Sequence, residues 1–317
     1  RLKLSGNDFV AKGFPAYGAG GLNGYLDVAE FDCQAVILSA IGARCGKCFH
    51  VDGQWTSLSN TQIIIPDPLR ADSRFLWHQL NDEKRWPRSG TGQPFIKPSD
   101  VKLHKVYLPP LEEQRRIAAF LDNTQNLKAK VAERSILISA LRRSLFLRRF
   151  GLPSENPHNL PMHRLVDICN PRQWPTISAK QLQSHGYPVF GANGLIGYFD
   201  RFNHAEPTVL VTCRGATCGT VNVSPPNCYV TGNSMAMDDP NPGLLTTDYL
   251  AWVLRLRGMS DVISGSAQPQ ITRQGLEAVT IPVPPIEAQN DFSNELMAVS
   301  GIADSSRHSE DSVSELA

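Results

Sequence analysis

A Cys-x-x-Cys spacing is the first feature of this 317-residue sequence that could do chemistry. Cys45 and Cys48 could bind one metal ion or exchange a disulfide, because thiolates at this spacing serve both purposes. A stretch 173 positions later repeats the surroundings, and it keeps Cys218 but has Val221 in place of the second cysteine. A metal or redox site would need both thiols, so the sequence favours buried or incidental cysteines.

A cysteine nucleophile with a histidine base is the second chemistry to consider. Cys45 and His50 could form such a pair. The later stretch has Val223 in place of His50, and no acid that would orient the imidazole is evident. The sequence also contains no Asn/Asp-Pro-Pro-Tyr/Phe methylase motif and no P-loop. We therefore expect a non-catalytic chain.

The repeat that removes these candidates runs through most of the chain. "FPAYGAGGLNGYLD" at residues 14–27 returns as "YPVFGANGLIGYFD" at residues 187–200, and "VILSAIGARCG" at 36–46 returns as "VLVTCRGATCG" at 209–219. After two inserted residues, "QPFI" from Gln93 meets "QPQI" from Gln268, and "LPPLEEQ" from Leu108 meets "VPPIEAQ" from Val283. A period this long is typical of tandem domains, since solenoid repeats run roughly 20 to 50 residues.

Each module reads as a mixture of short strands and a few helices. Strands are predicted at "AVILSA" from Ala35, "TQIIIP" from Thr61, "TVLVTC" from Thr208 and "VTIPV" from Val279. "TTDYLAWVLRL" from Thr246 predicts a capped helix with one apolar face. The expected fold class is α+β, with two homologous mixed α/β domains related as a pseudo-twofold repeat.

The repeated glycines have a structural and a chemical interpretation. Gly18, Gly21 and Gly24, like their counterparts Gly191, Gly194 and Gly197, fit a tight loop between strands, because glycine adopts positive φ at little cost. A phosphate-binding loop is the alternative. No Lys-Ser/Thr pair follows and the dinucleotide-binding spacing is absent, which favours the structural interpretation.

The segment after the first Pro-Pro has the periodicity of a long helix that packs along another helix. Apolar residues recur at alternating spacings of three and four, which is the heptad pattern of a coiled coil. The candidate interface residues are Ile117, Phe120, Leu127, Val131, Ile138, Leu141 and Leu145. Glu112 and Glu113 suit the positive N-terminal end of a helix, and Gly151 suits its end. We interpret this segment as a spacer.

A matching helix is expected after the second Pro-Pro. Phe292, Val299 and Ile302 fall at equivalent positions, but the apolar pattern fails beyond Ile302. This second helix is therefore expected to be short or truncated. The second module also has a lead-in from Leu160, "LPMHRLVDICNPRQ", whose counterpart would precede Arg1, so the first module is expected to be incomplete at its N-terminal side.

Composition excludes several classes of protein. The net charge of +1 gives no global sign of a polyanion partner, and the 41% hydrophobic content is ordinary for a globular protein. No apolar run approaches the roughly 20 residues that cross a bilayer, and no signal peptide is evident. Seven cysteines without a framework spacing suit a reducing compartment. We expect a cytoplasmic chain without a membrane partner.

Two motifs together carry a family resemblance. The repeated "P-x-(Y/F)-G-A-x-G-L-x-G-Y" turn and the repeated "(L/V)-P-P-(L/I)-E-x-Q" helix entry resemble those of the specificity subunit of a type I restriction-modification enzyme. The resemblance implies two target recognition domains that each read half of a split site in double-stranded DNA. It also implies long coiled-coil helices that seat two modification (methyltransferase) subunits. S-adenosylmethionine and ATP would then belong to the modification and restriction subunits, with no cofactor or metal on this chain.

The resemblance and the repeat together give the expected domain boundaries. Target recognition domain 1 would span residues 1–108, the spacer helix 109–150, target recognition domain 2 residues 151–283, and the second helix 284–317. An alternative stays open, in which the chain is a truncated specificity subunit that no longer reads DNA and serves as a protein-interaction scaffold.

Base readout requires Arg, Asn or Gln side chains beside phosphate-contacting Lys, Ser and Thr. The candidates near the repeated strands are Arg44, Lys47, Ser57 and Asn60 in the first module and Asn193, Arg214, Thr217 and Asn233 in the second. In the alignment of the two modules, Arg44 is equivalent to Thr217, and Ile41 is equivalent to Arg214. Two domains that share a fold but read different bases require such differences. Asn60 and Asn233 are identical across the repeat, so a structural turn is an equally good interpretation of that pair.

Overall fold

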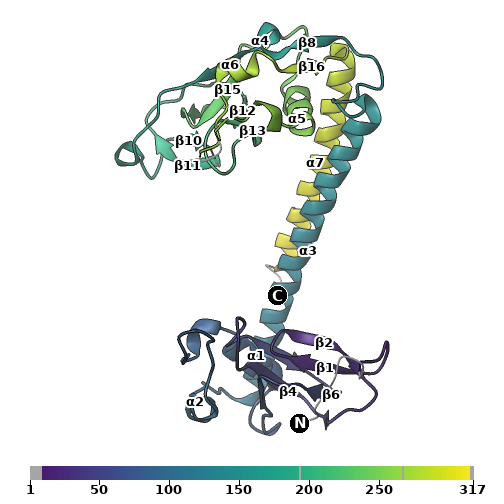
Figure 1. Cartoon of the computed structure of the whole chain (residues 1–317), viewed down its shortest axis with the longest axis vertical. Coiled ribbons are helices and arrows are strands. Elements are labelled where there is room, and N and C mark those ends of the chain that lie inside the picture. The colour runs from purple at the N-terminus through teal and green to yellow at the C-terminus, as the bar shows by residue number, and fades with distance from the viewer. Residues whose placement is uncertain (1–8, 193, 266–267, 315–317) are drawn as a thin grey trace. The chain divides into compact units, whose positions relative to one another are not determined.

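The computed structural model describes residues 9–192, 194–265 and 268–314, with side chains described as far as Gly301. The chain divides into two compact units, residues 1–133 and 134–317. A 40-residue helix, α3 (Leu111–Phe150), begins in unit 1 and ends in unit 2 (Figure 1). Mixed α/β units of this kind, with one long helix, confirm the predicted fold class.

Unit 1 is built on two small sheets. Its elements are β1 (Phe14–Gly18), β2 (Gly21–Leu26), β3 (Phe31–Asp32), β4 (Ala35–Ser39), β5 (Cys48–Val51), β6 (Gln54–Ser57), β7 (Thr61–Ile64), α1 (Ser73–Leu80), a 3-10 turn η2 (Glu83–Arg85) and α2 (Pro98–Leu103). The sheet orders are β2-β1-β6-β3 and β5-β4-β7. Strand β4 is buried along its whole length, so it forms the centre of the unit.

Unit 2 repeats this plan and adds strands to it. Its elements are β8 (Met162–Arg164), α4 (Leu165–Ile168), β9 (Asn170–Gln173), η3 (Ala179–Gln181), β10 (Tyr187–Gly191), β11 (Gly194–Phe199), β12 (Val209–Thr212), β13 (Val221–Val223), β14 (Tyr229–Val230), β15 (Ser234–Asp238), α5 (Thr247–Arg257), η4 (Ser260–Val262), α6 (Arg273–Leu276), β16 (Thr280–Pro282) and α7 (Ile286–Ser314). The sheet orders are β11-β10-β14, β13-β12-β15-β9 and β16-β8.

The repeated glycines form the predicted hairpins. Gly18 pairs with Gly21 at the tip of β1–β2, and Gly191 pairs with Gly194 at the tip of β10–β11. Gly21 and Gly194 have φ of 107° and 97°, a conformation that residues with a Cβ rarely adopt. Both hairpins carry a register shift at the same place, and both first strands pair in parallel with a later strand. The predicted tight turn is confirmed for Gly21 and Gly194, whereas Gly24 and Gly197 lie inside β2 and β11.

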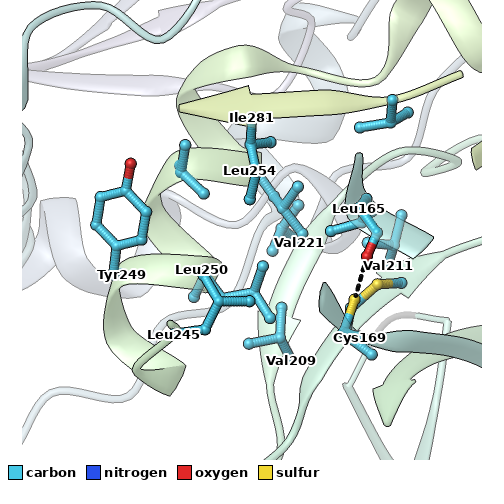
Figure 2. Close-up of a cluster of buried hydrophobic side chains, with 14 of the residues drawn as sticks. Leu165, Cys169, Val209, Val211, Val221, Leu245, Tyr249, Leu250, Leu254 and Ile281 are labelled. Carbon is cyan, nitrogen blue, oxygen red and sulfur yellow. Dashed lines mark hydrogen bonds between the residues drawn. The ribbon is translucent and has the colours of Figure 1, made fainter. Parts of the chain in front are cut away.

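The core of unit 2 lies between its four-stranded sheet and the helices α3, α4, α5, α6 and α7. Leu250 and Leu254 of α5 and Leu165 of α4 point toward Val211 and Val221 of the sheet (Figure 2). Thr246 caps α5 by accepting a hydrogen bond from the Tyr249 N–H at 3.2 Å, as the sequence predicted. The end of α3 joins this core through Phe146 and Phe150. Phe146 stacks on Tyr249, and the other contacts of these two rings with Tyr249 and with Phe292 of α7 are edge-to-face.

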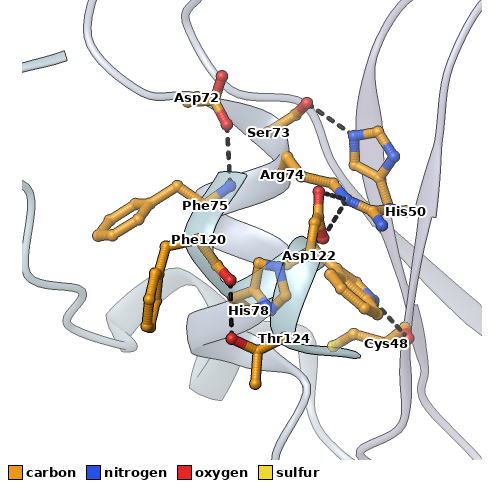
Figure 3. Close-up of polar contacts among 11 residues, drawn as sticks. Cys48, His50, Asp72, Ser73, Arg74, Phe75, His78, Phe120, Asp122 and Thr124 are labelled. Atoms are coloured by element: carbon orange, nitrogen blue, oxygen red, sulfur yellow. Dashed lines mark hydrogen bonds and ion pairs between the residues drawn. The ribbon is translucent and has the colours of Figure 1, made fainter. Parts of the chain in front are cut away.

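The start of α3 is fixed to unit 1 by polar contacts. Asp122 accepts hydrogen bonds from Arg74 Nε at 2.8 Å and contacts His78 Nε2 at 2.8 Å, and both partners lie on α1 (Figure 3). These contacts hold the pKa of Asp122 below its ordinary value despite the opposing effect of burial. The two ends of α3 are thus packed by different means, one polar and one aromatic.

Candidate nucleic-acid interface

The loop after the central strand has the same backbone hydrogen bonds in both units. In unit 1 the Ser39 N–H donates to the Lys47 carbonyl at 2.8 Å, and the Gly46 N–H donates to the Ser39 carbonyl at 2.9 Å. In unit 2 the Thr212 N–H donates to the Thr220 carbonyl and the Gly219 N–H to the Thr212 carbonyl, both at 2.8 Å. One loop frame, residues 40–47 and 213–220, is therefore built twice with different side chains.

A distant segment lies beside each of these loops. The Gly42 N–H donates to the Pro94 carbonyl at 2.9 Å in unit 1, and the Gly215 N–H donates to the Pro269 carbonyl at 3.2 Å in unit 2. The Ile96 N–H likewise donates to the Ala40 carbonyl at 2.9 Å. Residues 89–96 in unit 1, and their counterparts 264–265 and 268–271 in unit 2, thus form a second wall of each candidate interface.

The tip of the β1–β2 hairpin lies beside the loop in unit 1, and the tip of the β10–β11 hairpin has the same place in unit 2. Arg44 Nη1 donates to the Gly20 carbonyl at 2.5 Å, which joins the loop to the β1–β2 tip. In unit 2 the contact with the β10–β11 tip comes from the end of β12 instead, where the Thr212 hydroxyl donates to the Ala192 carbonyl at 2.6 Å. The loop, the second wall and the hairpin tip form a compact surface in each unit, which we call the tip surface.

Two of the predicted residues of unit 1 lie on its tip surface. Arg44 is exposed, and Lys47 is half-buried at the end of the loop. Ser57 lies instead inside the unit, 2% exposed, with its hydroxyl 2.7 Å from Thr61 Oγ1. A hydroxyl buried in this way does not reach a phosphate in this conformation.

Asn60 and Asn233 have the same backbone role. The Ala40 N–H donates to the Asn60 carbonyl at 2.9 Å, and the Cys213 N–H donates to the Asn233 carbonyl at 3.1 Å. Asn60 also has a φ of 65°, which Asn tolerates better than most residues. The structural interpretation of this pair accounts for their identity across the repeat.

The candidates of unit 2 are distributed as follows. Arg214 and Thr217 are exposed on the loop 213–220. Asn193 lies outside the described residues. Arg214 forms an antiparallel bridge with Gln270, so the loop and the second wall are in contact at the guanidinium-bearing residue.

Sequence reasoning missed the polar residues of the second wall. Gln93, Gln268 and Gln270 are exposed there, and a glutamine amide can bond to adenine in two places. Gln270 corresponds to Phe95 across the repeat, so this position differs between the units. The signal was present in the repeated "QPFI" and "QPQI", but only the fold brings these residues to the loop.

The thiols considered for catalysis are structural. Cys45 donates to the Ala40 carbonyl at 3.4 Å, while His50 Nε2 lies 2.9 Å from the Ser73 hydroxyl, so the two do not form a pair. Burial raises the pKa of Cys48 to about 12. The pKa of His50 is lowered, mainly by burial and to a smaller extent by the nearby positive charge of Arg74. Within the described residues, no cluster of three or more His, Cys, Asp or Glu side chains could hold a metal ion.

A hollow of about 560 Å³ lies in unit 2, away from its tip surface. Its polar groups bond to one another, since Asp238 accepts from Trp174 Nε1 at 2.9 Å and contacts His204 Nε2 at 2.9 Å. This network joins β15 to the segments on either side of it. The hollow is therefore explained by the packing of unit 2.

The apolar residues predicted along α3 are largely exposed. Phe120, Leu127, Val131 and Leu141 are between 47% and 70% exposed, and Ile117, Ile138 and Leu145 are half-buried. Within unit 2, α3 contacts α7 through Arg149 Nη2, 2.7 Å from Glu295 Oε1, and through Arg142 Nη2, 2.7 Å from Ser300 Oγ. No helix within the described part of the chain has the length and apolar character to span a bilayer.

Comparison with known proteins points to one family. The sequence matches the family described as "Type I restriction modification DNA specificity domain" over residues 3–136 and again over 157–301. It is 26% identical over 236 residues to the type I restriction enzyme EcoprrI specificity subunit of Escherichia coli, covering 69% of this chain and 58% of that protein. It is 22% identical over 293 residues to the putative MjaX specificity subunit of Methanocaldococcus jannaschii, covering 80% of this chain and 67% of that protein.

The fold agrees with these sequence matches. The chain aligns with the crystal structure of the type I restriction-modification system S subunit from M. genitalium with a TM-score of 0.72 and 17% identity, covering 99% of this chain and 89% of that one. The chain spans between 54% and 67% of the length of the curated relatives that it matches. Two matched segments account for most of its residues, and the chain therefore belongs to the family of type I restriction modification DNA specificity domains.

Proposed function

We propose that this chain is the DNA-reading specificity subunit of a type I restriction-modification complex, in which each unit reads one half of a split site in double-stranded DNA. The observation that carries the proposal is the tip surface, one hydrogen-bonded frame built twice with different exposed side chains. Arg44 corresponds to Thr217, and Arg214 corresponds to Ile41. A shared frame with exchanged side chains is what two different half-sites require.

The residues proposed to contact DNA are those exposed on the two tip surfaces. Arg44 and Arg214 would donate to guanine or phosphate, while Gln270 is suited to adenine. Lys47 and Thr217 would contact phosphates. Ser57 is left out because it is buried, and Asn60 and Asn233 act through their backbone carbonyls.

The proposal assigns no catalytic step to this chain. Methylation with S-adenosylmethionine would belong to two modification subunits seated on the exposed apolar residues of α3, and ATP-driven steps would belong to restriction subunits. The chain would act in the cytoplasm, where its DNA substrate lies. Family membership and the exposed apolar side chains of α3 support this assignment of the catalytic steps to partner subunits.

The test is a methylome of cells that carry this chain with its cognate modification subunit. A split methylated motif is expected. Arg44→Ala should relax or abolish reading of one half only, and Arg214→Ala of the other, by about 5-fold to 150-fold for a bidentate contact worth about 1–3 kcal/mol. The matched control is Arg201→Ala, an exposed arginine of unit 2 outside the tip surface, which should leave both halves intact.

Three results would contradict the proposal. An unsplit motif would contradict the reading of two half-sites. Loss of both halves in either single variant would contradict separate readout by the two units. If the modification subunit co-purifies with the chain but no salt-sensitive DNA binding is found, the chain is a protein scaffold.

A further inference from the structure

The tip of each glycine hairpin carries an exposed leucine. Leu22 of β2 is 51% exposed, and Leu195 of β11 is 53% exposed. The two leucines occupy the same position of the repeat, directly after Gly21 and Gly194, whose positive φ forms the turn. Each unit therefore presents the same apolar side chain at the same end of its hairpin.

A β-bulge lies beside each leucine. The pairing register of β1–β2 skips Asn23, and that of β10–β11 skips Ile196. A bulge interrupts the alternation of side chains along a strand and changes the direction in which they point. Leu22 and Asn23 are accordingly consecutive and both exposed, as are Leu195 and Ile196. The strand geometry thus directs two neighbouring side chains outward in each unit.

The first of these two side chains is identical in both units, and the second is not. Asn23 and Ile196 differ in chemistry, as positions that meet different bases would. A residue that two modules share either supports their fold or makes a contact that both modules need. Leu22 and Leu195 leave about half of their surface free, so packing within the unit does not account for them. The free half is available to a ligand that both units bind.

Each leucine lies next to the cationic part of its tip surface. The Gly20 carbonyl, two residues before the leucine of unit 1, accepts from Arg44 Nη1 at 2.5 Å. The Ala192 carbonyl, three residues before the leucine of unit 2, is bonded to the end of β12, which leads into the loop that carries Arg214. Neither loop, 40–47 or 213–220, contains an Asp or a Glu. An apolar tip beside cations is complementary to DNA, where stacked bases lie beside phosphates.

We propose that Leu22 and Leu195 are wedges that insert between neighbouring base pairs, one in each half-site, and unstack the DNA there. Leucine is among the apolar side chains that open base steps in proteins that kink DNA. Such a contact occupies the space between two base pairs and needs no particular base edge, which explains why both units keep the same residue. The inference rests on the proposed function, and it adds a deformation of the DNA that is separate from base readout by Arg44 and Arg214.

The first test measures stacking in the complex of this chain with its cognate modification subunit. Duplexes carry the split motif that the methylome identifies, with 2-aminopurine at successive positions of each half-site other than the methylated adenine. The fluorescence of this base rises when stacking is lost, and at saturating protein we expect a rise at one step of each half-site. Leu22→Ala should abolish the rise in one half-site only, and Leu195→Ala in the other. Methionine at either position should preserve it, because methionine also acts as a wedge.

The second test measures affinity and its dependence on salt. Each alanine variant should bind about 5-fold to 10-fold more weakly, as expected when the exposed half of a leucine side chain is no longer buried. The salt dependence should stay that of the wild type, because no cation is removed, whereas Lys47→Ala should reduce its slope by about 1. The matched control is Val28→Ala, at a valine that is 56% exposed after the far end of β2, and it should bind as the wild type does.

The third test changes the DNA. Unstacking costs least at flexible pyrimidine–purine steps. Replacing the unstacked step of the first half-site by a stiff AA step should weaken binding of the wild type and change binding of Leu22→Ala much less. Equal weakening of both proteins would mean that base contacts read this step, and would overturn the wedge.

The outcomes separate the wedge from the proposed function. Specific, salt-sensitive binding without any fluorescence rise, or with a rise that persists in both alanine variants, would overturn the wedge and leave the function standing. If the wild-type complex binds no DNA, both are overturned. Loss of the modification subunit from the purified leucine variants, with both units folded by circular dichroism, would show a protein contact at the hairpin tip and would also overturn the wedge.

Discussion

The glutamine of the repeated "P-P-(L/I)-E-x-Q" motif is a structural clamp. Gln114 is fully buried, and its amide donates to the carbonyls of Arg70 at 3.0 Å and Pro109 at 2.7 Å. Its oxygen accepts from the Asp72 N–H at 2.9 Å. Gln289 makes the same three kinds of bond at the start of α7, to Leu244, Pro284 and Thr246. The motif therefore joins each long helix to the loop before α1 or α5.

Replacing this glutamine should destabilise the chain. Gln114→Ala leaves two carbonyls and one N–H without a partner in a buried position, which costs about 1–3 kcal/mol. Urea denaturation is the measurement, and Gln125→Ala, at an exposed glutamine of the same helix, is the control with an expected change within about 0.5 kcal/mol. Equal stability of the two variants would show that the clamp contributes little.

The buried Cys48 thiol should make stability depend on alkaline pH. Burial raises its pKa from 9.0 to about 12, so the unfolded chain loses this proton more readily than the folded chain. The stability that the protonated Cys48 thiol contributes is fully present below pH 9 and is lost as pH rises toward 12. Through this one group, the free energy of unfolding changes by at most about 1.4 kcal/mol per pH unit.

The measurement is the free energy of unfolding of wild type and Cys48→Ala between pH 7 and pH 10.5. Above pH 9 the wild type should lose stability more steeply than the variant. Cys33→Ala removes a partly exposed thiol and should keep the wild-type slope. Parallel curves for the wild type and Cys48→Ala would contradict the prediction.

At the scale of elements, α3 is packed at its two ends and exposed between them. Gln114 and Ala118 are buried near its start, and Phe146 and Phe150 near its end. Each pair is spaced by four residues, so each occupies one face of the helix. Ile138 is half-buried and Leu141 is 47% exposed, which leaves apolar surface between the packed ends.

This apolar surface should be needed for assembly. Ile138→Asp with Leu141→Asp places two charges in a contact that we expect a modification subunit to cover, at a cost of about 3–5 kcal/mol if the contact is dry. Co-purification of that subunit should be lost while both units stay folded by circular dichroism. Ser135→Asp with Ser144→Asp adds the same charge at exposed positions of α3 and should assemble normally. Retained co-purification of the first variant would contradict this role of α3.

At the scale of the whole molecule, one helix belongs to both units. We predict that α3 sets the unread gap between the half-sites. Inserting one apolar-patterned heptad after Ala129 keeps the interface face and lengthens the helix by about 10 Å, at 1.5 Å per residue. At about 3.4 Å per base pair, the gap should grow by about three base pairs.

The methylome of cells carrying the insertion measures this gap directly. Both half-sites should keep their bases. An unchanged gap with full activity would mean that α3 does not set the spacing, and altered bases would mean that it takes part in readout. A control that replaces residues 123–129 with another heptad of the same pattern keeps the length and should keep the gap.

Neighbouring residues and the repeat were enough to predict several features of the structure. The duplication, the glycine hairpins, the Thr246 cap and the length of α3 follow from local conformational preferences and periodicity, which act over a few residues. The equal roles of Asn60 and Asn233 were also among the open interpretations, because an identical residue in two modules with different specificities suggests a turn.

Which of the candidate residues share a surface depends on long-range packing. Ser57 is buried because β6 pairs with strands far from it in the sequence. Gln93 lies beside the loop 40–47 because the Gly42 N–H donates a hydrogen bond to the carbonyl of its neighbour Pro94. Such contacts join segments tens of residues apart, and their geometry depends on how the strands and helices pack, which the local pattern of either segment does not contain.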